Sequence, residues 1–244
     1  MIDKQAFISE LNTRFSSNGL ASLLNMERCE RFYSLTVHML EENEKYNLTA
    51  IKDPEKIILG HYVDCCAASA FLKKNARIAD IGCGAGFPSL PLAIVRDDIS
   101  ITAIDSTAKR VNYVDQTAKM LGLTNVTAVT MRAEDGGKDP EYREQFDYAT
   151  ARAVAELRIL AELCLPYVKT GGQFIAMKGK NAEFELQNAK KAIALLGGRN
   201  TTVKEISLKG KDEVLSHPLI LIDKKEKTPK NYPRPFAQIS KKPL

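Results

Sequence analysis

The chain has 244 residues, of which 44% are hydrophobic and 27% charged, and this composition excludes a disordered or fibrous protein. No stretch approaches the roughly 20 consecutive apolar residues of a membrane span, and the N-terminus lacks the apolar core of a signal peptide. The five cysteines and three histidines have no disulfide-framework or metal-ligand spacing, so we expect a cytoplasmic protein without a metal site.

The predicted elements change in character along the chain. Residues 1–75 have apolar side chains at helical spacing, and Pro54 is placed to open a helix. From residue 77, short β-rich runs alternate with helical stretches, which predicts a parallel sheet covered on both faces. Two last extended runs, 201–208 and 217–223, lack a helix between them and are expected to pair antiparallel at the sheet edge. The strands are expected at 77–82, 100–105, 125–130, 146–151 and 172–178, and the helices near 88–96, 107–121, 154–167 and 181–196.

We therefore expect an α/β protein with a Rossmann-like, seven-stranded, mostly parallel sheet that has an antiparallel edge strand. An N-terminal helical extension (1–75) precedes this domain (76–223), and a basic C-terminal arm (224–244) follows it. The arm alone has a net charge of +6, so the rest of the chain is nearly neutral. Such a segment is either a phosphate-contacting arm or a solvated terminus.

A glycine loop follows the first predicted strand. Gly82, Gly84 and Gly86 lie between this strand and a helix that Pro88 is expected to open. Glycines allow a tight turn and a close approach of a ligand to the backbone. Ligands of open α/β sheets bind at this edge, outside the carboxyl ends of the strands. The loop therefore predicts a binding site.

Charge and spacing indicate which ligand the loop takes. A dinucleotide loop needs glycine where Phe87 stands, and Asp80 would repel a pyrophosphate. The Asp80 carboxylate instead favours an ammonium or sulfonium group, and S-adenosylmethionine carries both and no phosphate. Asp105 ends the next strand, where an acid accepts hydrogen bonds from ribose hydroxyls. The plainer alternative is a structural turn with acids that only terminate strands.

Two further strand ends carry polar residues. The loop around Glu134 lies where it would bind an adenine amino group, but polar loops after strands are common, so the sequence alone favours a plain surface loop here. Arg152 ends the fourth strand, where it is expected to contact either the cofactor or an RNA phosphate. The alternative for Arg152 is a surface ion pair with Glu156, four residues on.

These segments together resemble the glucose-inhibited division protein B family. The resemblance spans about residues 47–180 and resumes in the tail at Tyr232-Pro-Arg and Lys241-Lys-Pro-Leu. It departs from the family at Cys83, at Ser89 and in the tail link Pro235-Phe-Ala-Gln-Ile-Ser, where the family usually has a Gly-rich stretch. The segments that carry it are DIGCGAGFPSLPLAIV (80–95), DSTAKRVNYV (105–114), RAED (132–135), FDYATARAVAEL (146–157) and GGQFIAMKGK (171–180).

The resemblance implies a class I methyltransferase that methylates N7 of a guanine in 16S ribosomal RNA and uses S-adenosylmethionine. Its substrate would be that RNA or the small ribosomal subunit, and we expect a monomer. Guanine N7 carries a lone pair, so the enzyme has mainly to align it with the methyl group, with assistance from Arg152 rather than a catalytic base. The implied cofactor contacts are Gly82, Phe87, Ala133, Glu134 and Arg152, to which the loop argument adds Asp80, Gly84, Gly86 and Asp105.

Basic residues near this edge are candidates for RNA contact. For Lys109 and Arg110 a solvated helix face is an equal alternative, whereas Lys178 ends the fifth strand at the ligand edge. The candidates are Lys109, Arg110, Lys178, Lys180, Arg234, Lys241 and Lys242.

Other functions remain open from the sequence, among them a methyltransferase that acts on another RNA. An NAD-dependent oxidoreductase would need glycine at Phe87, and a small-molecule methyltransferase leaves the basic tail unexplained. An inactive binding module is disfavoured by the intact glycine loop and its two acids.

Overall fold

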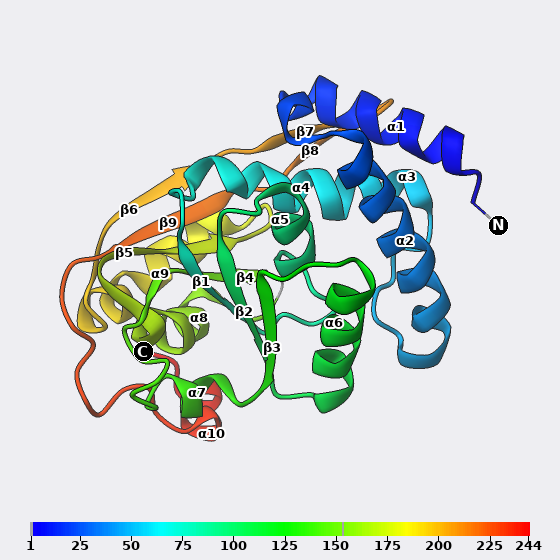
Figure 1. Ribbon diagram of the computed structural model, residues 1–244. Coiled ribbons are helices and arrows are strands. Elements are labelled where there is room, and N and C mark those ends of the chain that lie inside the picture. Colours follow the sequence, from blue (N-terminus) through cyan, green and yellow to red (C-terminus); the bar gives the residue numbers. More distant parts are fainter. Residues whose placement is uncertain (1, 153) are drawn as a thin grey trace.

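A seven-stranded sheet forms the centre of the molecule (Figure 1). The computed structural model describes residues 2–152 and 154–244; Ala153, inside one of the quoted segments, and Met1 lie outside them. The strand order is β3-β2-β1-β4-β5-β9-β6, and the first five strands along the chain run parallel, as predicted. The strands are β1 (Arg77–Ile81), β2 (Ser100–Asp105), β3 (Val126–Thr130), β4 (Phe146–Arg152), β5 (Val168–Met177), β6 (Gly198–Lys204) and β9 (Leu219–Lys224).

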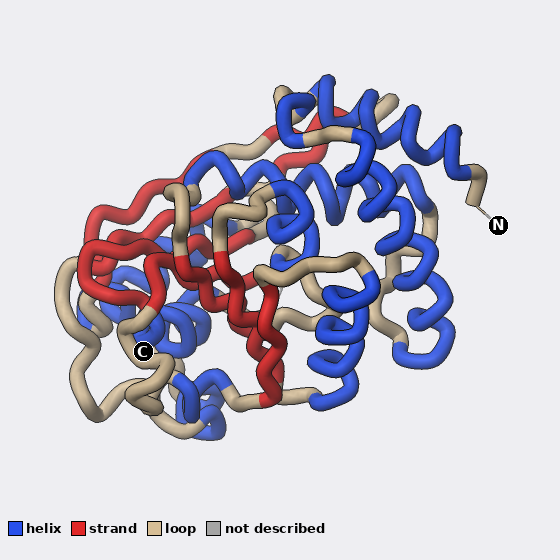
Figure 2. Tube along the Cα trace, in the orientation of Figure 1, coloured by secondary structure: helices blue, strands red, loops and turns tan. Residues whose placement is uncertain are grey.

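Helices cover both faces of the sheet, because the strands alternate apolar side chains toward each face (Figure 2). Helices α5 and α6 pack with the N-terminal helices in one buried cluster, whereas α8 and α9 belong to a second cluster on the opposite face. These helices are α5 (Ser89–Val95), α6 (Ala108–Met120), α7 (Ala133–Gly136), α8 (Leu157–Cys164) and α9 (Ala182–Leu195).

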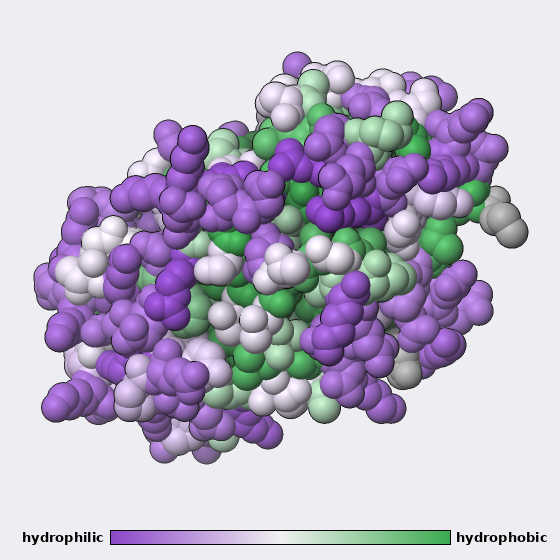
Figure 3. All heavy atoms as spheres, viewed as in Figure 1, coloured by the Kyte–Doolittle hydropathy of each residue, from purple (hydrophilic) through white to green (hydrophobic). Residues whose placement is uncertain are grey.

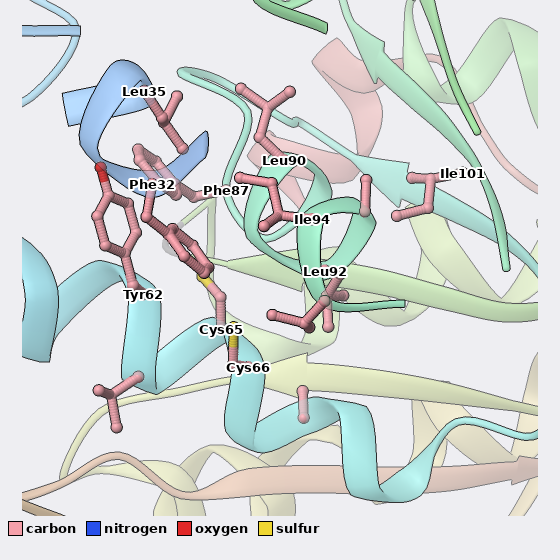
Figure 4. Close-up of a cluster of buried hydrophobic side chains, with 14 of the residues drawn as sticks. Phe32, Leu35, Tyr62, Cys65, Cys66, Phe87, Leu90, Leu92, Ile94 and Ile101 are labelled. Atoms are coloured by element: carbon pink, nitrogen blue, oxygen red, sulfur yellow. The ribbon is translucent and has the colours of Figure 1, made fainter. Parts of the chain in front are cut away.

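The N-terminal extension is helical, as predicted, and it shares a core with the sheet. Side chains at helix starts accept backbone hydrogen bonds: Asn25 caps α2, and Asp53 caps α3 just before Pro54. Phe32 of α2 packs 4.7 Å from Tyr62, centroid to centroid, beside residues of α5 (Figure 4). The extension comprises α1 (Lys4–Ser17), a 3-10 turn (Ala21–Leu23), α2 (Met26–Tyr46), α3 (Pro54–Ile57), a π-helical turn (Ile58–Val63), α4 (Asp64–Ala67) and a second 3-10 turn (Ala68–Phe71).

The antiparallel pair predicted at the sheet edge is present, with two differences in detail. The later strand, β9, inserts between β5 and β6, because residues 219–222 are all buried whereas β6 alternates exposed polar residues suited to an edge. The expected run 201–208 is also broken: β6 stops at Lys204, and a separate hairpin follows. Its strands are β7 (Ser207–Lys209) and β8 (Val214–Ser216).

The basic C-terminal segment folds back on the domain and ends in α10 (Phe236–Lys241), which packs on α8 (Figure 1). Its first residue, Lys224, is fully buried as the end of β9 and donates hydrogen bonds to Leu165 O and Thr228 Oγ1. Lys224 is therefore a structural residue and not part of an arm. Among the described residues, no helix combines the length and the apolar composition that a membrane crossing requires.

Candidate functional site

The glycine loop forms the tight turn that its sequence predicts. Gly82, Gly84 and Gly86 all have positive φ angles, of 73°, 54° and 84°, which glycine adopts without steric cost. The backbone N–H of Gly82 donates to Ile104 O at 2.8 Å, which ties the loop to the neighbouring strand. Helix α5 starts at Ser89, one residue later than expected.

A pocket of about 450 Å³ lies beside this loop, at the carboxyl ends of the first four strands. This is the edge at which open α/β sheets bind ligands. Figure 3 shows one face of the molecule, on which hydrophilic side chains surround a central band of hydrophobic and neutral ones. Of the predicted cofactor contacts, the pocket brings together Gly82, Gly84, Phe87, Asp105, Ala133, Glu134 and Arg152.

Asp105 is held in place at the pocket wall by backbone donors. Its Oδ1 accepts from the Thr107 N–H at 2.8 Å, and its Oδ2 accepts from the Gly84 N–H at 3.1 Å. The Arg110 guanidinium lies 3.6 Å away. The carboxylate therefore joins the ends of β1 and β2 and presents its remaining acceptor positions to the pocket.

Asp80 and Gly86 do not line the pocket, contrary to expectation. The Asp80 carboxylate is only 1% exposed and accepts from Ser89 Oγ at 2.5 Å and from Thr150 Oγ1 at 3.1 Å. Burial raises the pKa of Asp80 to about 6, although both hydrogen bonds oppose the shift. Strand alternation explains the difference, because Asp80 points with Ile78 toward α5. Asp80 thus braces the loop, and Gly86 packs against Leu90.

Arg152 pairs with the N-terminal extension, not with Glu156. One guanidinium nitrogen donates to Asp64 Oδ2 and to Gly60 O, both at 2.9 Å, and the other lies 2.7 Å from His61 Nδ1. The second Asp64 oxygen lies 3.2 Å from His217 Nδ1. The positive charge of Arg152 at the end of β4 is therefore balanced by the buried Asp64 carboxylate. Because Asp64 lies far from Arg152 in the sequence, no local spacing could predict this pair.

His61 belongs to the pocket and comes from the N-terminal extension. The π-helical turn places its ring on Phe87, with centroids 4.5 Å apart. Burial and the adjacent Arg152 lower the pKa of His61 to about 4. Because the guanidinium can only donate, His61 is neutral and accepts at Nδ1, while Nε2 lies 3.0 Å from Thr49 Oγ1.

We expect His61 to make the protein less stable as the pH falls from about 6.5 toward about 4. In this window the unfolded chain binds the imidazole proton and the folded protein does not, so the free energy of unfolding falls by at most about 3 kcal/mol. His217, whose pKa Asp64 raises, acts in the opposite direction. Because the two histidines act in opposite directions, the effect of His61 is isolated by comparing two proteins. The measurement is the free energy of unfolding, from urea denaturation, of wild type and of His61→Gln at several pH values across this window.

The His61→Gln variant is expected to lose less stability than wild type on acidification. His38→Gln, on α2 outside the pocket, is the matched control for removing a histidine. If the free energy of unfolding changed with pH equally in wild type and in His61→Gln, this would contradict a neutral His61 in the folded protein.

The predicted RNA-binding cations separate into two groups. Lys178 and Arg234 are structural: Lys178 Nζ donates to Ala155 O and pairs with Glu185, and Arg234 pairs with the fully buried Glu162. Both were predicted to contact RNA, but these ion pairs hold their side chains against the protein. The others are exposed, and only Arg110 of them lines the pocket: Lys109, Arg110, Lys180, Lys241 and Lys242.

The sequence did not predict the parts of the pocket that come from the N-terminal helical extension and from the C-terminal segment. Leu48 and Thr49 follow α2, and Phe236 begins α10. The sequence around Leu48 carried only a family resemblance, and Phe236 carried no signal. The unpredicted lining residues also include His61, Ile81, Cys83, Ala85, Ile104, Ser106, Met131, Arg132, Val154 and Leu163.

Comparison with known proteins finds one family repeatedly. A family profile described as rRNA small subunit methyltransferase G matches residues 28–215. A relative from Clostridium perfringens (strain 13 / Type A), named ribosomal RNA small subunit methyltransferase G, is 44% identical over 90% of this chain and 92% of its own length. One with the same name from Oceanobacillus iheyensis is 45% identical over 91% of this chain and 93% of its own.

Solved structures with low sequence identity share the fold. A SAM-dependent methyltransferase from Aquifex aeolicus superposes with a TM-score of 0.52 at 20% identity, covering 75% of this chain and 97% of its own. TYW2 from M. jannaschii, solved in complex with AdoMet, gives a TM-score of 0.53 at 16% identity over 68% of this chain and 76% of its own. The sheet and its helices therefore have the same fold as these proteins.

Proposed function

Because the chain belongs to the rRNA small subunit methyltransferase G family, we propose that it methylates N7 of a guanine in 16S ribosomal RNA. The methyl donor is S-adenosylmethionine. The observation that supports this function most directly is the pocket itself, where a glycine turn, two carboxylates and a stacked aromatic ring meet at the ends of four strands.

The residues present fit this cofactor. A volume of about 450 Å³ lies within the range of small-molecule sites, and Asp105 and Glu134 supply acceptors for ribose hydroxyls and the adenine amino group. The loop approaches the pocket closely, since a Cβ at Gly82 would lie 2.8 Å from Val154 Cγ2. We propose that Gly82 and Gly84 lie against the amino-acid part of the cofactor and that Ala133 and Glu134 hold its adenine.

The reaction needs alignment more than proton transfer. S-adenosylmethionine supplies an activated methyl group on a positively charged sulfur. One C–N bond forms at N7 and one C–S bond breaks, and no proton leaves the guanine. The histidine of the pocket is accordingly not free to act as a base: His61 accepts from Arg152, and its other ring nitrogen lies beside Thr49. Arg152, whose guanidinium lies 5.3 Å from the Phe87 ring centroid, holds that wall in place.

A second part of the proposal concerns the exposed cations and the RNA backbone. We propose that Lys109, Arg110 and Lys180 act with the tail residues Lys241 and Lys242. Each phosphate contact releases counterions, so binding weakens as salt rises. The substrate is the RNA alone or within the small subunit, and we propose that the chain acts as a cytoplasmic monomer.

Replacing Lys241 and Lys242 together by glutamine is expected to reduce the slope of log affinity against log salt by roughly 1 to 2. The measurement is fluorescence titration of a 16S RNA fragment at several salt concentrations. Lys190→Gln with Lys191→Gln, an exposed pair on α9, removes the same charge as a control. An equal change in both double variants would show a general charge effect and contradict a tail contact.

The function is tested by incubating the purified protein with unmodified small ribosomal subunits and labelled S-adenosylmethionine. We expect label in 16S RNA at a single guanine, identified as N7-methylguanine by mass spectrometry of the digested RNA. Label on another base, on another RNA or on a small molecule only would overturn the proposal.

A further inference from the structure

The C-terminal segment supplies an aromatic wall of the pocket. Phe236, the first residue of α10, lines the pocket and remains 42% exposed, unlike most aromatic residues of the chain. It comes from a segment far in sequence from the strand ends that form the rest of the site. Because this phenylalanine lines a pocket and is partly exposed, a flat ligand bound there would cover apolar surface of its ring.

Anchors on both sides fix the position of Phe236. Before it, Arg234 donates to Glu162 of α8 at 2.6 and 2.8 Å, and Glu162 is fully buried. After it, Ile239 is fully buried in the cluster that contains α8. Arg234 also donates to Lys242 O at 3.1 Å, which closes the segment on itself. Phe236 is therefore presented by a docked element, as a preformed site requires.

The neighbours of this segment show which end of the pocket it covers. A Cβ added to Gly137, just after α7, would lie 2.9 Å from Pro233 Cγ. Arg143 donates to both Gly137 O and Tyr232 O, which ties the tail to α7. Helix α7 carries Ala133 and Glu134, which hold the adenine in the proposed function. Phe236 thus lies at the adenine end of the pocket.

We propose that Phe236 stacks on the adenine ring of the cofactor, which makes the docked C-terminal segment part of the cofactor site. This inference rests on the proposed function, because it requires an adenine nucleoside in the pocket. Stacking of a base on an aromatic side chain is favourable and does not depend on the exact base edge. Phe236 lines the same pocket as Ala133 and Glu134, which places it within the site that the nucleoside would occupy.

Calorimetric titration with S-adenosylhomocysteine tests the inference without an RNA substrate. Phe236→Ala is expected to raise the dissociation constant about 10-fold, within the range of roughly 5- to 150-fold for loss of one stacked base. Phe236→Tyr keeps the ring and should remain within about twofold of wild type. Phe184→Ala, which removes a 69% exposed phenylalanine from α9, is the matched control and should change nothing.

Methylthioadenosine locates the effect on the ligand. It keeps the adenosine and lacks the amino-acid part, so Phe236→Ala should weaken its binding by the same factor. An unchanged dissociation constant for both ligands in a folded Phe236→Ala variant would overturn the inference. A higher KM for RNA with unchanged nucleoside affinity would instead assign Phe236 to the RNA. If wild-type protein binds neither ligand, the proposed function itself fails.

Discussion

Replacing Gly82 by valine is expected to weaken S-adenosylmethionine binding by at least about 100-fold. Gly82 has a φ of 73°, and a side chain there costs about 1–2 kcal/mol in backbone strain. Its Cβ would also lie 2.8 Å from Val154 Cγ2, and a branched side chain would extend into the site where Gly82 lines the pocket. Isothermal titration calorimetry on the purified variant measures the loss.

Gly19 offers a closely matched control for this prediction. Its φ is 72°, nearly that of Gly82, but no atom lies within 4 Å of an added Cβ. Gly19→Val therefore introduces the same backbone strain far from the pocket and should leave the affinity unchanged. If a folded Gly82→Val protein bound the cofactor as well as Gly19→Val does, the loop would not approach the ligand.

Replacing Arg152 by methionine is expected to have the second large effect, on both stability and methyl transfer. Removing the guanidinium takes the arginine away from the buried Asp64 carboxylate and leaves His217 beside it, which costs up to about 3–5 kcal/mol. It also frees His61 and Phe87, so we expect kcat/KM for RNA methylation to fall by about 100-fold. Urea denaturation and initial rates measure the two effects.

A second substitution separates stability from positioning. Asp64→Asn combined with Arg152→Met removes the uncompensated charge and should restore much of the stability. Methyl transfer should stay low, because the group that holds His61 and Phe87 is still missing. Recovery of full activity in the double variant would mean that Arg152 only balances the charge of Asp64.

The sequence predicted the sheet and the glycine loop well because both depend on local spacing. Strand and helix periods alternate within a few residues, and the three glycines mark a turn that only they adopt cheaply. The prediction that Asp105 belongs to the site followed from its place at the end of a strand, and the structure brings it to the pocket with Gly82.

Contacts between distant segments could not be predicted in the same way. Asp80 lies in a strand buried on both faces, so spacing did not tell which face its carboxylate takes. Lys178 and Arg234 were candidates for RNA contact in sequence, but they pair with Glu185 of α9 and Glu162 of α8. Phe236 joins the pocket only because the tail docks on α8, a long-range event without a local signature.

Calorimetric titration of the purified wild-type chain with S-adenosylmethionine and, separately, with NAD tests the central claim most directly. The pocket, with its carboxylates and without the third glycine of a dinucleotide loop, predicts saturable binding of one S-adenosylmethionine per chain and no binding of NAD. Binding of NAD together with no measurable heat from S-adenosylmethionine would contradict it.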